Sequence, residues 1–270
     1  MSTNNGSLPN LVIIGAMKCG TTSLHEYLNL HPQICMSRIK EPEFFIKNNW
    51  NKGLDWYRSL FPHPAPVMGE SSSSYTKYPI FTGVPERMAS VLPDAKLIYL
   101  VRDPVKRIVS QYVHMVSHHG EDQSIEQAVR REGNEYIPYS KYFFQLSKFL
   151  EYYPMERVCV VSFEDLQKDR RKTMRTLFEF LGVDPSFESE HFEEVHHRSA
   201  DKRRPNRLKQ LLRNVRGFYR LNRHVPWLFG SAIERPQLDE ALKQRLIEVL
   251  HKDIDEFKRV TGRSFDSWCL

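Results

Sequence analysis

The sequence predicts an α/β fold with a central parallel sheet flanked by helices. Short apolar runs alternate along the chain with segments in which apolar residues recur at helical spacing. Parallel strands need helical crossovers, so this alternation is typical of a parallel sheet covered by helices. The chain has 270 residues, of which 40% are hydrophobic and 27% charged, as expected for one large folded domain.

The first strand and helix are predicted between residues 11 and 30. The run "LVIIGA" is apolar throughout, which indicates a strand buried on both faces. The segment "TTSLHEYLNL" follows it, with Leu24 and Leu28 at helical spacing behind a threonine start. We expect the polar residues 1–10 to form a disordered tail and residues 11–270 to form a single domain.

Three further strand–helix pairs are predicted downstream. "PVMGE" predicts a strand that precedes a helix through "PERMASVL". "AKLIYLVR" predicts a strand that ends at Arg102, and the next helix begins with Asp103 as its N-cap and Pro104 at its first position. "ERVCVVSFEDL", residues 156–166, predicts the last strand, and the helix "RKTMRTLFEFLG" is expected to end at Gly182.

The loop "GAMKCGTT", residues 15–22, has the composition of an anion site. Its glycines and threonines let backbone N–H groups approach an anion at a helix start, where the helix dipole favours negative charge. Lys18 adds a cation, but it precedes Gly20, whereas a standard P-loop has its lysine after the second glycine. The loop predicts a site for phosphate or a group of similar shape. The alternative is an ordinary turn with an incidental lysine.

Lys18, Glu70 and Arg102 all fall at the carboxyl ends of predicted strands, where parallel α/β sheets bind their ligands. In "LIYLVRDPVKRIVSQY", Ser110 follows Arg102 at a distance of two helical turns. An arginine and a hydroxyl in this arrangement can bind a second phosphate through charge-assisted hydrogen bonds. An arginine at a strand end more commonly makes a surface ion pair, so this segment alone is a weak signal.

Together the two segments resemble the nucleotide site of the sulfotransferases that use 3′-phosphoadenosine 5′-phosphosulfate (PAPS). "GAMKCGTTSL" is similar to their loop for the 5′-phosphosulfate, and "LVRDPVKRIVSQY" to their element for the 3′-phosphate. "KEPEFF" and "GESSSSY" place the resemblance nearest the heparan-sulfate and Golgi-type carbohydrate branch and its bacterial relatives. The resemblance implies a P-loop-like sulfotransferase fold.

The resemblance also implies roles for individual residues of the nucleotide site. The residues expected to hold the 5′-phosphosulfate are consecutive: Lys18, Cys19, Gly20, Thr21, Thr22 and Ser23. Lys18 is also expected to act in catalysis by stabilising the leaving phosphate oxygen, while Arg102 and Ser110 are expected to bind the 3′-phosphate. "HHRSADKRRP" is similar to a lid over the nucleotide, or else is a basic surface turn; its candidate residues are Lys202, Arg203 and Arg204.

Glu41 in "KEPEFF" matches the general base of the family, which takes the proton from the acceptor hydroxyl or amine. Glu43 matches a variable position, and the alternative for both is a charged loop beside a core pair of phenylalanines. Another branch uses histidine as the base. His114, His118 and His119 are better explained as the cationic end of a helix.

The acceptor is not fixed by the sequence. The carbohydrate enzymes of animals commonly carry a lysine and a proline after the glutamate of "GESSSSY", but this chain has Ser71 and Ser73 at those places. We therefore expect a neutral sugar, a glycolipid or a small metabolite rather than a polyanionic glycan. The helical region of residues 124–153 and the segment 206–235 are expected to shape the acceptor pocket.

Charge and cysteine content bear on partners and location. A net charge of +6 and an isoelectric point near 9.1 favour anionic partners, and residues 198–220 hold much of the excess. The four cysteines form no CxxC pair, so neither a zinc site nor a disulfide framework is expected, and no other cluster predicts a metal. With no transmembrane segment or leader evident, we expect a cytoplasmic protein.

Two other functions compete with sulfuryl transfer. A nucleotide-dependent kinase with an atypical phosphate loop would bind ATP and magnesium, but its lysine is misplaced and no strand ends in a clear magnesium-binding aspartate. A non-catalytic anion or nucleic-acid binder would use residues 198–220. No recognised nucleic-acid motif is present, so we expect no nucleic-acid partner.

Overall fold

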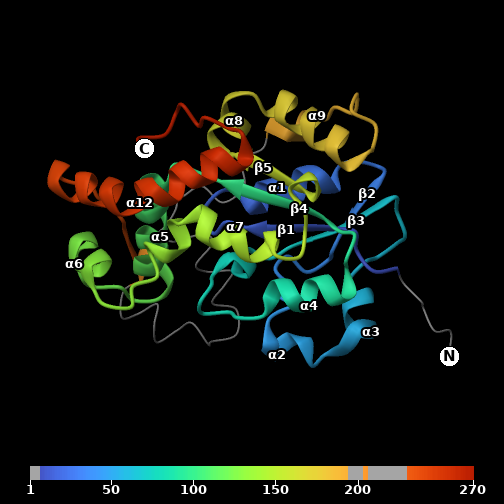
Figure 1. The fold of residues 1–270 in the computed structure, drawn as a ribbon, viewed down its shortest axis with the longest axis horizontal. Helices are drawn as coiled ribbons and strands as arrows, with labels where there is room; N and C mark the ends of the chain where they lie inside the picture. Colours follow the sequence, from blue (N-terminus) through green and yellow to red (C-terminus); the bar gives the residue numbers. More distant parts are fainter. Residues whose placement is uncertain (1–6, 194–202, 206–229) are drawn as a thin grey trace.

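A computed structural model of the chain describes residues 7–193, 203–205 and 230–270, and its centre is a five-stranded sheet (Figure 1). All the pairings in this sheet are parallel, and the strand order is β2-β3-β1-β4-β5. The strands are β1 (Leu11–Gly15), β2 (Ile34–Met36), β3 (Val67–Ser71), β4 (Lys96–Val101) and β5 (Val158–Ser162). The predicted α/β fold with a parallel sheet is confirmed.

Helices surround the sheet. They are α1 (Thr21–Asn29), α2 (Lys47–Trp50), α3 (Gly53–Arg58), α4 (Val84–Val91), α5 (Pro104–His118), α6 (Ile125–Arg130), α7 (Tyr142–Leu150), α8 (Phe163–Lys168), α9 (Arg170–Leu181) and α12 (Glu240–Thr261). Figure 1 shows α8 and α9 at the top of the view and α2, α3 and α4 at the bottom, with the sheet between them. The long helix α12 packs against α5 and α7. Two short strands, β6 (Arg203–Pro205) and β7 (Gly230–Ala232), form a separate antiparallel pair.

The core explains why the predicted strands are apolar without alternation. Every residue of β1 is buried, because β3 and β4 pair with it on its two sides and helices cover both faces of the sheet. The strand β2 was not predicted from the sequence. It has only three residues, too few to show a periodic pattern.

Two predicted segments differ from the structure. The expected strand at residues 156–166 ends at Ser162, whose side chain accepts a hydrogen bond from the backbone N–H of Asp165 and so caps α8. Residues 124–153 do not form one long helical region, because α6 ends at Arg130 and α7 begins only at Tyr142.

Some residues for which the sequence made predictions lie outside the described residues. They include residues 1–6 of the predicted tail, and beyond the tail Lys202 and the segment 206–229. Within the described part of the tail, Asn10 donates its backbone N–H to the carbonyl of Met68 at 2.9 Å. In the described parts of the chain, no helix is both long and apolar enough to cross a membrane.

Asp103 ties the start of α5 to the end of the chain. Its carboxylate accepts from the backbone N–H of Lys106 at 3.0 Å, as predicted for an N-cap, and from the backbone N–H of Cys269 at 3.0 Å. Trp268 donates its indole N–H to Glu164 at 3.1 Å, and Glu164 also accepts from the backbone N–H of Asp103. The C-terminal residues therefore fix the corner between β4 and α5.

Asp103→Ala is expected to lower the free energy of unfolding by about 2–3 kcal/mol, because it removes an N-cap and leaves a second N–H without its acceptor. Asp103→Asn keeps one acceptor oxygen for the N-cap, so its loss should be about half as large. Urea denaturation monitored by circular dichroism measures both values. If both variants lose the same free energy of unfolding, the N-cap hydrogen bond does not contribute separately to stability.

Candidate functional site

The residues around the candidate site come shortly after the ends of the five parallel strands. Glu41 follows β2, Ser73 follows β3, Lys18 follows β1, Arg102 follows β4 and Phe163 follows β5. Because the strands are parallel and adjacent, their carboxyl ends meet at one edge of the sheet. The expected site at this edge therefore gathers side chains that are up to 145 positions apart in the sequence, the interval between residues 18 and 163.

The loop of residues 15–22, called the glycine loop below, requires glycine at two positions. Gly20 has φ 95°, and a Cβ there would lie 2.9 Å from the ring of Phe163. A Cβ on Gly15 would lie 2.1 Å from Oγ1 of Thr76. These contacts explain the two glycines, because the loop is pressed between the turn after β3 and the start of α8.

Helix α1 begins at the glycine loop, and its N-terminus is suited to an anion. Its N-cap is Gly20, no side chain caps its first turn, and that turn holds no acidic residue. The first N–H groups of a helix lack partners within the helix, and the dipole favours negative charge there. Thr21 is buried, while Thr22, Ser23 and Lys18 are half-buried. The composition that predicted an anion site therefore coincides with this geometry.

Arg102 does not make the surface ion pair that was its alternative explanation. Its guanidinium lies 4.6 Å from the ring centroid of Phe163, its Nε is buried without a hydrogen-bond partner, and no described carboxylate pairs with it. The pKa of Arg235 is lowered, first by burial and then by the nearby charge of Arg102. Two neighbouring guanidinium groups of this kind are suited to an anion between them.

The other residues expected near the 3′-phosphate are less open. Ser110 is buried in α5, with 3% of its surface exposed. Arg203 is half-buried in β6, and β6 packs against α5. Of the other two lid candidates, Arg204 is described only as part of β6, and Lys202 lies outside the described residues.

The hydroxyl of Tyr142 connects the glycine loop with Arg102. It donates to the carbonyl of Arg102 at 2.6 Å, accepts from the N–H of Arg102 at 3.3 Å and lies 3.8 Å from Sγ of Cys19. Burial raises the pKa of Cys19 to about 11, so this residue stays a neutral thiol inside the loop. Tyr142 was not predictable from the sequence, because no local pattern distinguishes it from a core tyrosine.

Glu41 forms an ion pair with Lys40. Nζ of Lys40 lies 2.6 Å from Oε1, and the hydroxyl of Ser73 donates to the same oxygen at 3.0 Å. Burial by itself raises the pKa of Glu41, but Lys40, Ser73 and the charge of Lys77 outweigh burial, and the pKa is lowered. The carboxylate is therefore ionised near neutral pH, and the described residues give Oε2 no hydrogen-bond partner.

The turn η1 (Ser73–Thr76) contacts both Glu41 and the glycine loop. Ser73, at its start, donates to Glu41, and Thr76, at its end, is the side chain that a Cβ on Gly15 would meet. The turn is buried, so its two ends are held in a fixed relation. The turn therefore connects Glu41 with the glycine loop.

Lys77 is a second cation close enough to Glu41 to help lower the pKa of its carboxyl group. Lys77 donates to the hydroxyl of Ser74 at 3.0 Å. Burial lowers the pKa of Lys77, and the charges of Glu41, Glu43 and Glu135 oppose that effect. Sequence analysis did not single out Lys77 or Glu135, since both reach the site only through loops that the fold brings together.

Of the described histidines, His25 and the group at the end of α5 bear on the choice of a base. His25, in α1, is buried and its Nδ1 lies 3.0 Å from the hydroxyl of Ser71. Burial and then the charge of Lys40 lower its pKa to about 4, so the ring is neutral. The second group is at the C-terminal end of α5, where the rings of His118 and His119 lie 4.5 Å and 5.5 Å from that of His114.

Glu70 reaches the expected end of β3 but is fully buried. Its carboxylate accepts from Tyr75 at 2.7 Å, from Ser72 at 2.9 Å and from Tyr57 at 3.4 Å. Burial raises its pKa to about 7, although these three hydrogen bonds act in the opposite direction. Glu70 therefore organises the core beneath the site. The phenylalanines Phe44 and Phe45 are buried in contact with Tyr57, as the expected core pair.

These features define an α/β protein with a glycine-containing loop between a buried strand and an uncapped helix start, and with a carboxylate and arginines that follow strands of the same sheet. The sulfotransferase domain family matches residues 8–258, and the chain belongs to this family. In the described ranges, no group of three or more His, Cys, Asp or Glu side chains can hold a metal ion.

Relatives agree with the resemblance to heparan-sulfate enzymes. The bifunctional heparan sulfate N-deacetylase/N-sulfotransferase 2 of Homo sapiens is 30% identical over 201 residues, which cover 66% of this chain and 22% of that protein. The heparan sulfate glucosamine 3-O-sulfotransferase 3B1 of Mus musculus is 32% identical over 194 residues, covering 68% of this chain and 49% of that protein. The chain thus spans about a fifth of the first relative and about half of the second.

A solved structure has the same fold. The crystal structure of a sulfotransferase from Alicyclobacillus acidocaldarius superposes with a TM-score of 0.72 at 24% identity, covering 97% of this chain and 99% of that chain. The predicted sulfotransferase fold is therefore confirmed.

Glu70→Gln is expected to change how stability depends on pH. Because burial raises the pKa of Glu70 from 4.5 to about 7, the folded chain keeps a proton that the unfolded chain releases. The wild-type free energy of unfolding should therefore fall by up to about 3 kcal/mol as pH rises through this window. Urea denaturation near pH 5 and near pH 8 should show this fall in the wild type and not in the variant. If the free energy of unfolding of Glu70→Gln falls as much as that of the wild type, other groups cause the fall.

Proposed function

We propose that this chain transfers a sulfuryl group from PAPS to a hydroxyl or amine of an acceptor, with Glu41 as the general base. The observation that carries the proposal is the η1 turn, which contacts Glu41 through Ser73 and the glycine loop through Thr76. A base beside an anion loop is the arrangement that in-line group transfer to an acceptor requires. The family assignment supports the reaction class.

The donor is proposed to bind along the edge of the sheet. The N–H groups at the start of α1 and the side chains of Lys18, Thr21, Thr22 and Ser23 would hold the 5′-phosphosulfate, with Cys19 and Gly20 contributing backbone. Arg102 and Arg235 would bind the 3′-phosphate, because they are neighbouring cations without a described carboxylate partner. Ser110, Arg203, Lys202 and Arg204 remain proposed contacts for the same phosphate.

The chemistry needs a base and a stabilised leaving group. The acceptor oxygen or nitrogen forms the new bond to sulfur and gives its proton to Glu41, while the bond between sulfur and the phosphate oxygen breaks and 3′-phosphoadenosine 5′-phosphate (PAP) leaves. Oε2 of Glu41 is the oxygen without a described partner, so it is suited to receive the proton. Lys18 stabilises the negative charge on the leaving oxygen. No metal is assigned a part in this scheme.

The kinase alternative is less well supported. Asp103 is the carboxylate at the end of β4, but it accepts from the backbone N–H groups of Lys106 and Cys269. Lys18 also lies before Gly20, unlike the lysine of a standard P-loop. The nucleic-acid binder would depend on residues 198–220, most of which lie outside the described residues.

The acceptor is proposed to be a neutral sugar, a glycolipid or a small metabolite. Both relatives named above are heparan sulfate enzymes. In this chain, however, Ser71 is hydrogen-bonded to a neutral histidine, and Glu43 and Glu135 lie near Lys77 beside the proposed base. A polyanionic glycan would meet these carboxylates. A cytoplasmic location remains a prediction from the sequence.

Thermal unfolding with PAP tests the donor site. A ligand at 100 times its dissociation constant stabilises the folded state by about 2.7 kcal/mol, which corresponds to a Tm increase of roughly 5–10 °C. We expect this increase with PAP in the absence of magnesium, and little change with ATP, AMP or GTP. A larger increase with ATP and magnesium than with PAP would favour the kinase instead.

Glu41→Gln should lower kcat by about 10²–10⁴-fold, because the amide cannot accept the acceptor proton. PAP affinity should remain close to that of the wild type, since Glu41 does not contact the proposed donor site. Glu43→Gln is the matched control two residues away, and it should retain most of the activity. The measurement is sulfate transfer from radiolabelled PAPS to an active acceptor. Near-normal kcat in Glu41→Gln would remove Glu41 as the base.

A further inference from the structure

Arg107, in α5, is a fully buried cation that the proposed reaction does not use. Its Nε donates to Ser140 at 2.6 Å, and its Nη2 donates to Gln111 and to the carbonyl of Tyr136, each at 2.7 Å. All three acceptors are neutral. Nη1 has no hydrogen-bond partner, and no carboxylate pairs with Arg107 among the described residues.

A buried guanidinium without a carboxylate is unusual. Removing a charge from water is unfavourable unless an opposite charge compensates it, which is why buried arginines are normally paired. Burial accordingly lowers the pKa of Arg107. The described groups that hydrogen-bond to Arg107 are all neutral, so an anion bound near it would supply a counter-charge.

The position of Arg107 indicates which anion this is. Ser140, which holds Nε, is two residues before Tyr142, whose hydroxyl contacts both Cys19 in the glycine loop and the backbone of Arg102. Among the charged groups around Cys19, Arg107 has the largest effect on its pKa, where it opposes burial. Arg107 therefore lies behind the glycine loop, on the side of Cys19 and Tyr142.

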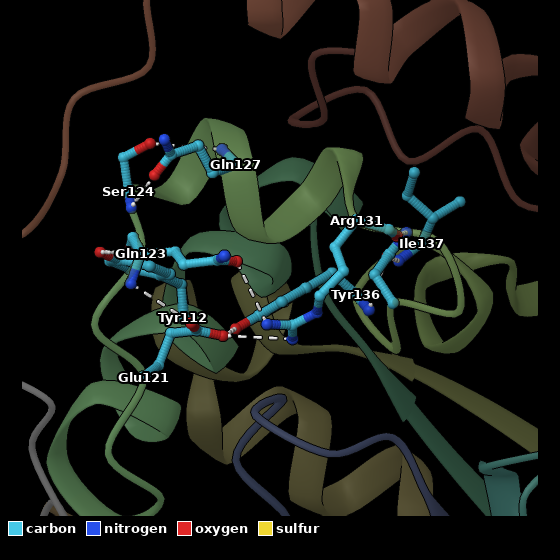
Figure 2. Close-up of polar contacts among 9 residues, drawn as sticks. Tyr112, Glu121, Gln123, Ser124, Gln127, Arg131, Tyr136 and Ile137 are labelled. Carbon is cyan, nitrogen blue, oxygen red and sulfur yellow. Dashed lines mark hydrogen bonds and ion pairs between the residues drawn. The ribbon is translucent and has the colours of Figure 1, made fainter.

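One acceptor of the guanidinium, Tyr136, belongs to a cluster of polar contacts. Figure 2 shows Tyr136 beside Glu121 and Arg131, in a cluster between α5 and α6. The hydroxyl of Tyr136 donates to Glu121 at 3.3 Å, and Arg131 pairs with the same carboxylate at 3.3 Å. The carbonyl of Tyr136 accepts from Arg107 and from the hydroxyl of Ser140, so the same two residues that hold the guanidinium also contact each other.

We propose that Arg107 is a positioning residue whose buried charge stabilises the anionic nucleotide on the glycine loop through space, without touching it. The inference rests on the proposed function, because it assumes that the loop binds the phosphosulfate end of the donor. Water does not surround the guanidinium, so its field at the loop is weakly screened. The helix dipole of α1 and Arg107 then act on the same anion from different directions.

The test compares variants that separate the charge from its hydrogen bonds. Arg107→Gln removes the charge and keeps an amide donor, Arg107→Lys keeps the charge, and Ser140→Ala removes one hydrogen bond from an intact arginine. Isothermal titration of the full chain with PAP, AMP and adenosine gives the affinities, and thermal unfolding gives the stability of each variant.

Arg107→Gln should weaken PAP binding by about tenfold or more, weaken AMP binding less and leave adenosine unchanged, because the effect scales with ligand charge. Arg107→Lys and Ser140→Ala should bind PAP within about threefold of the wild type even where their Tm falls. Equal loss for adenosine and PAP, or losses that follow Tm rather than charge, would overturn the proposal.

Two further arms keep the outcomes distinct. Inorganic pyrophosphate is titrated beside PAP, so a wild type that binds pyrophosphate but not PAP would count against the proposed donor while still testing the charge of Arg107. If Arg107→Gln does not fold, Arg107→Met takes its place, because a buried cation can be replaced by an apolar side chain of similar length without leaving a charge behind. The same tenfold loss of PAP affinity is expected, and a PAP affinity like that of the wild type would overturn the proposal.

Discussion

The geometry of the candidate site depends on one buried hydroxyl, that of Tyr142. It binds both the carbonyl and the N–H of Arg102 and touches Sγ of Cys19, so it joins the ends of β4 and β1 through a residue of α7. Burial strongly raises the pKa of Tyr142, so the hydroxyl keeps its proton and remains a donor. The glycine loop and Arg102 are thereby held at a fixed separation, as a ligand with two anionic ends requires.

Burial also assigns different tasks to neighbouring carboxylates. Glu70 is enclosed by two tyrosines and a serine, and its pKa rises to about 7. Glu41, in the adjacent loop, is partly exposed and paired with Lys40, and its pKa is lowered. Glu70 stabilises the core beneath the site, and Glu41 has the partial exposure that the proposed base requires. Solvent access, rather than residue type, separates the two roles.

The sequence predicted the central architecture well and its connections less well. Buried parallel strands are mostly apolar without alternation, so β1, β3, β4 and β5 were recognisable, as were the cap at Asp103 and the end of α9 at Gly182. The strand β2 is too short to show a pattern, and the break between α6 and α7 depends on loop contacts. The family assignment and the shared fold confirm the resemblance that the motifs indicated.

The sequence alone determined the glycine loop, the helix that follows it and the position of Arg102 at a strand end, because these features depend on local spacing. Only the tertiary structure decided which distant groups meet there: Tyr142 between Cys19 and Arg102, Ser73 on Glu41, and Arg235 beside Arg102. It also left Arg107 buried with no carboxylate partner in the described parts of the chain. Burial and charge neighbours arise from packing between segments far apart in the chain, so no local pattern encodes them.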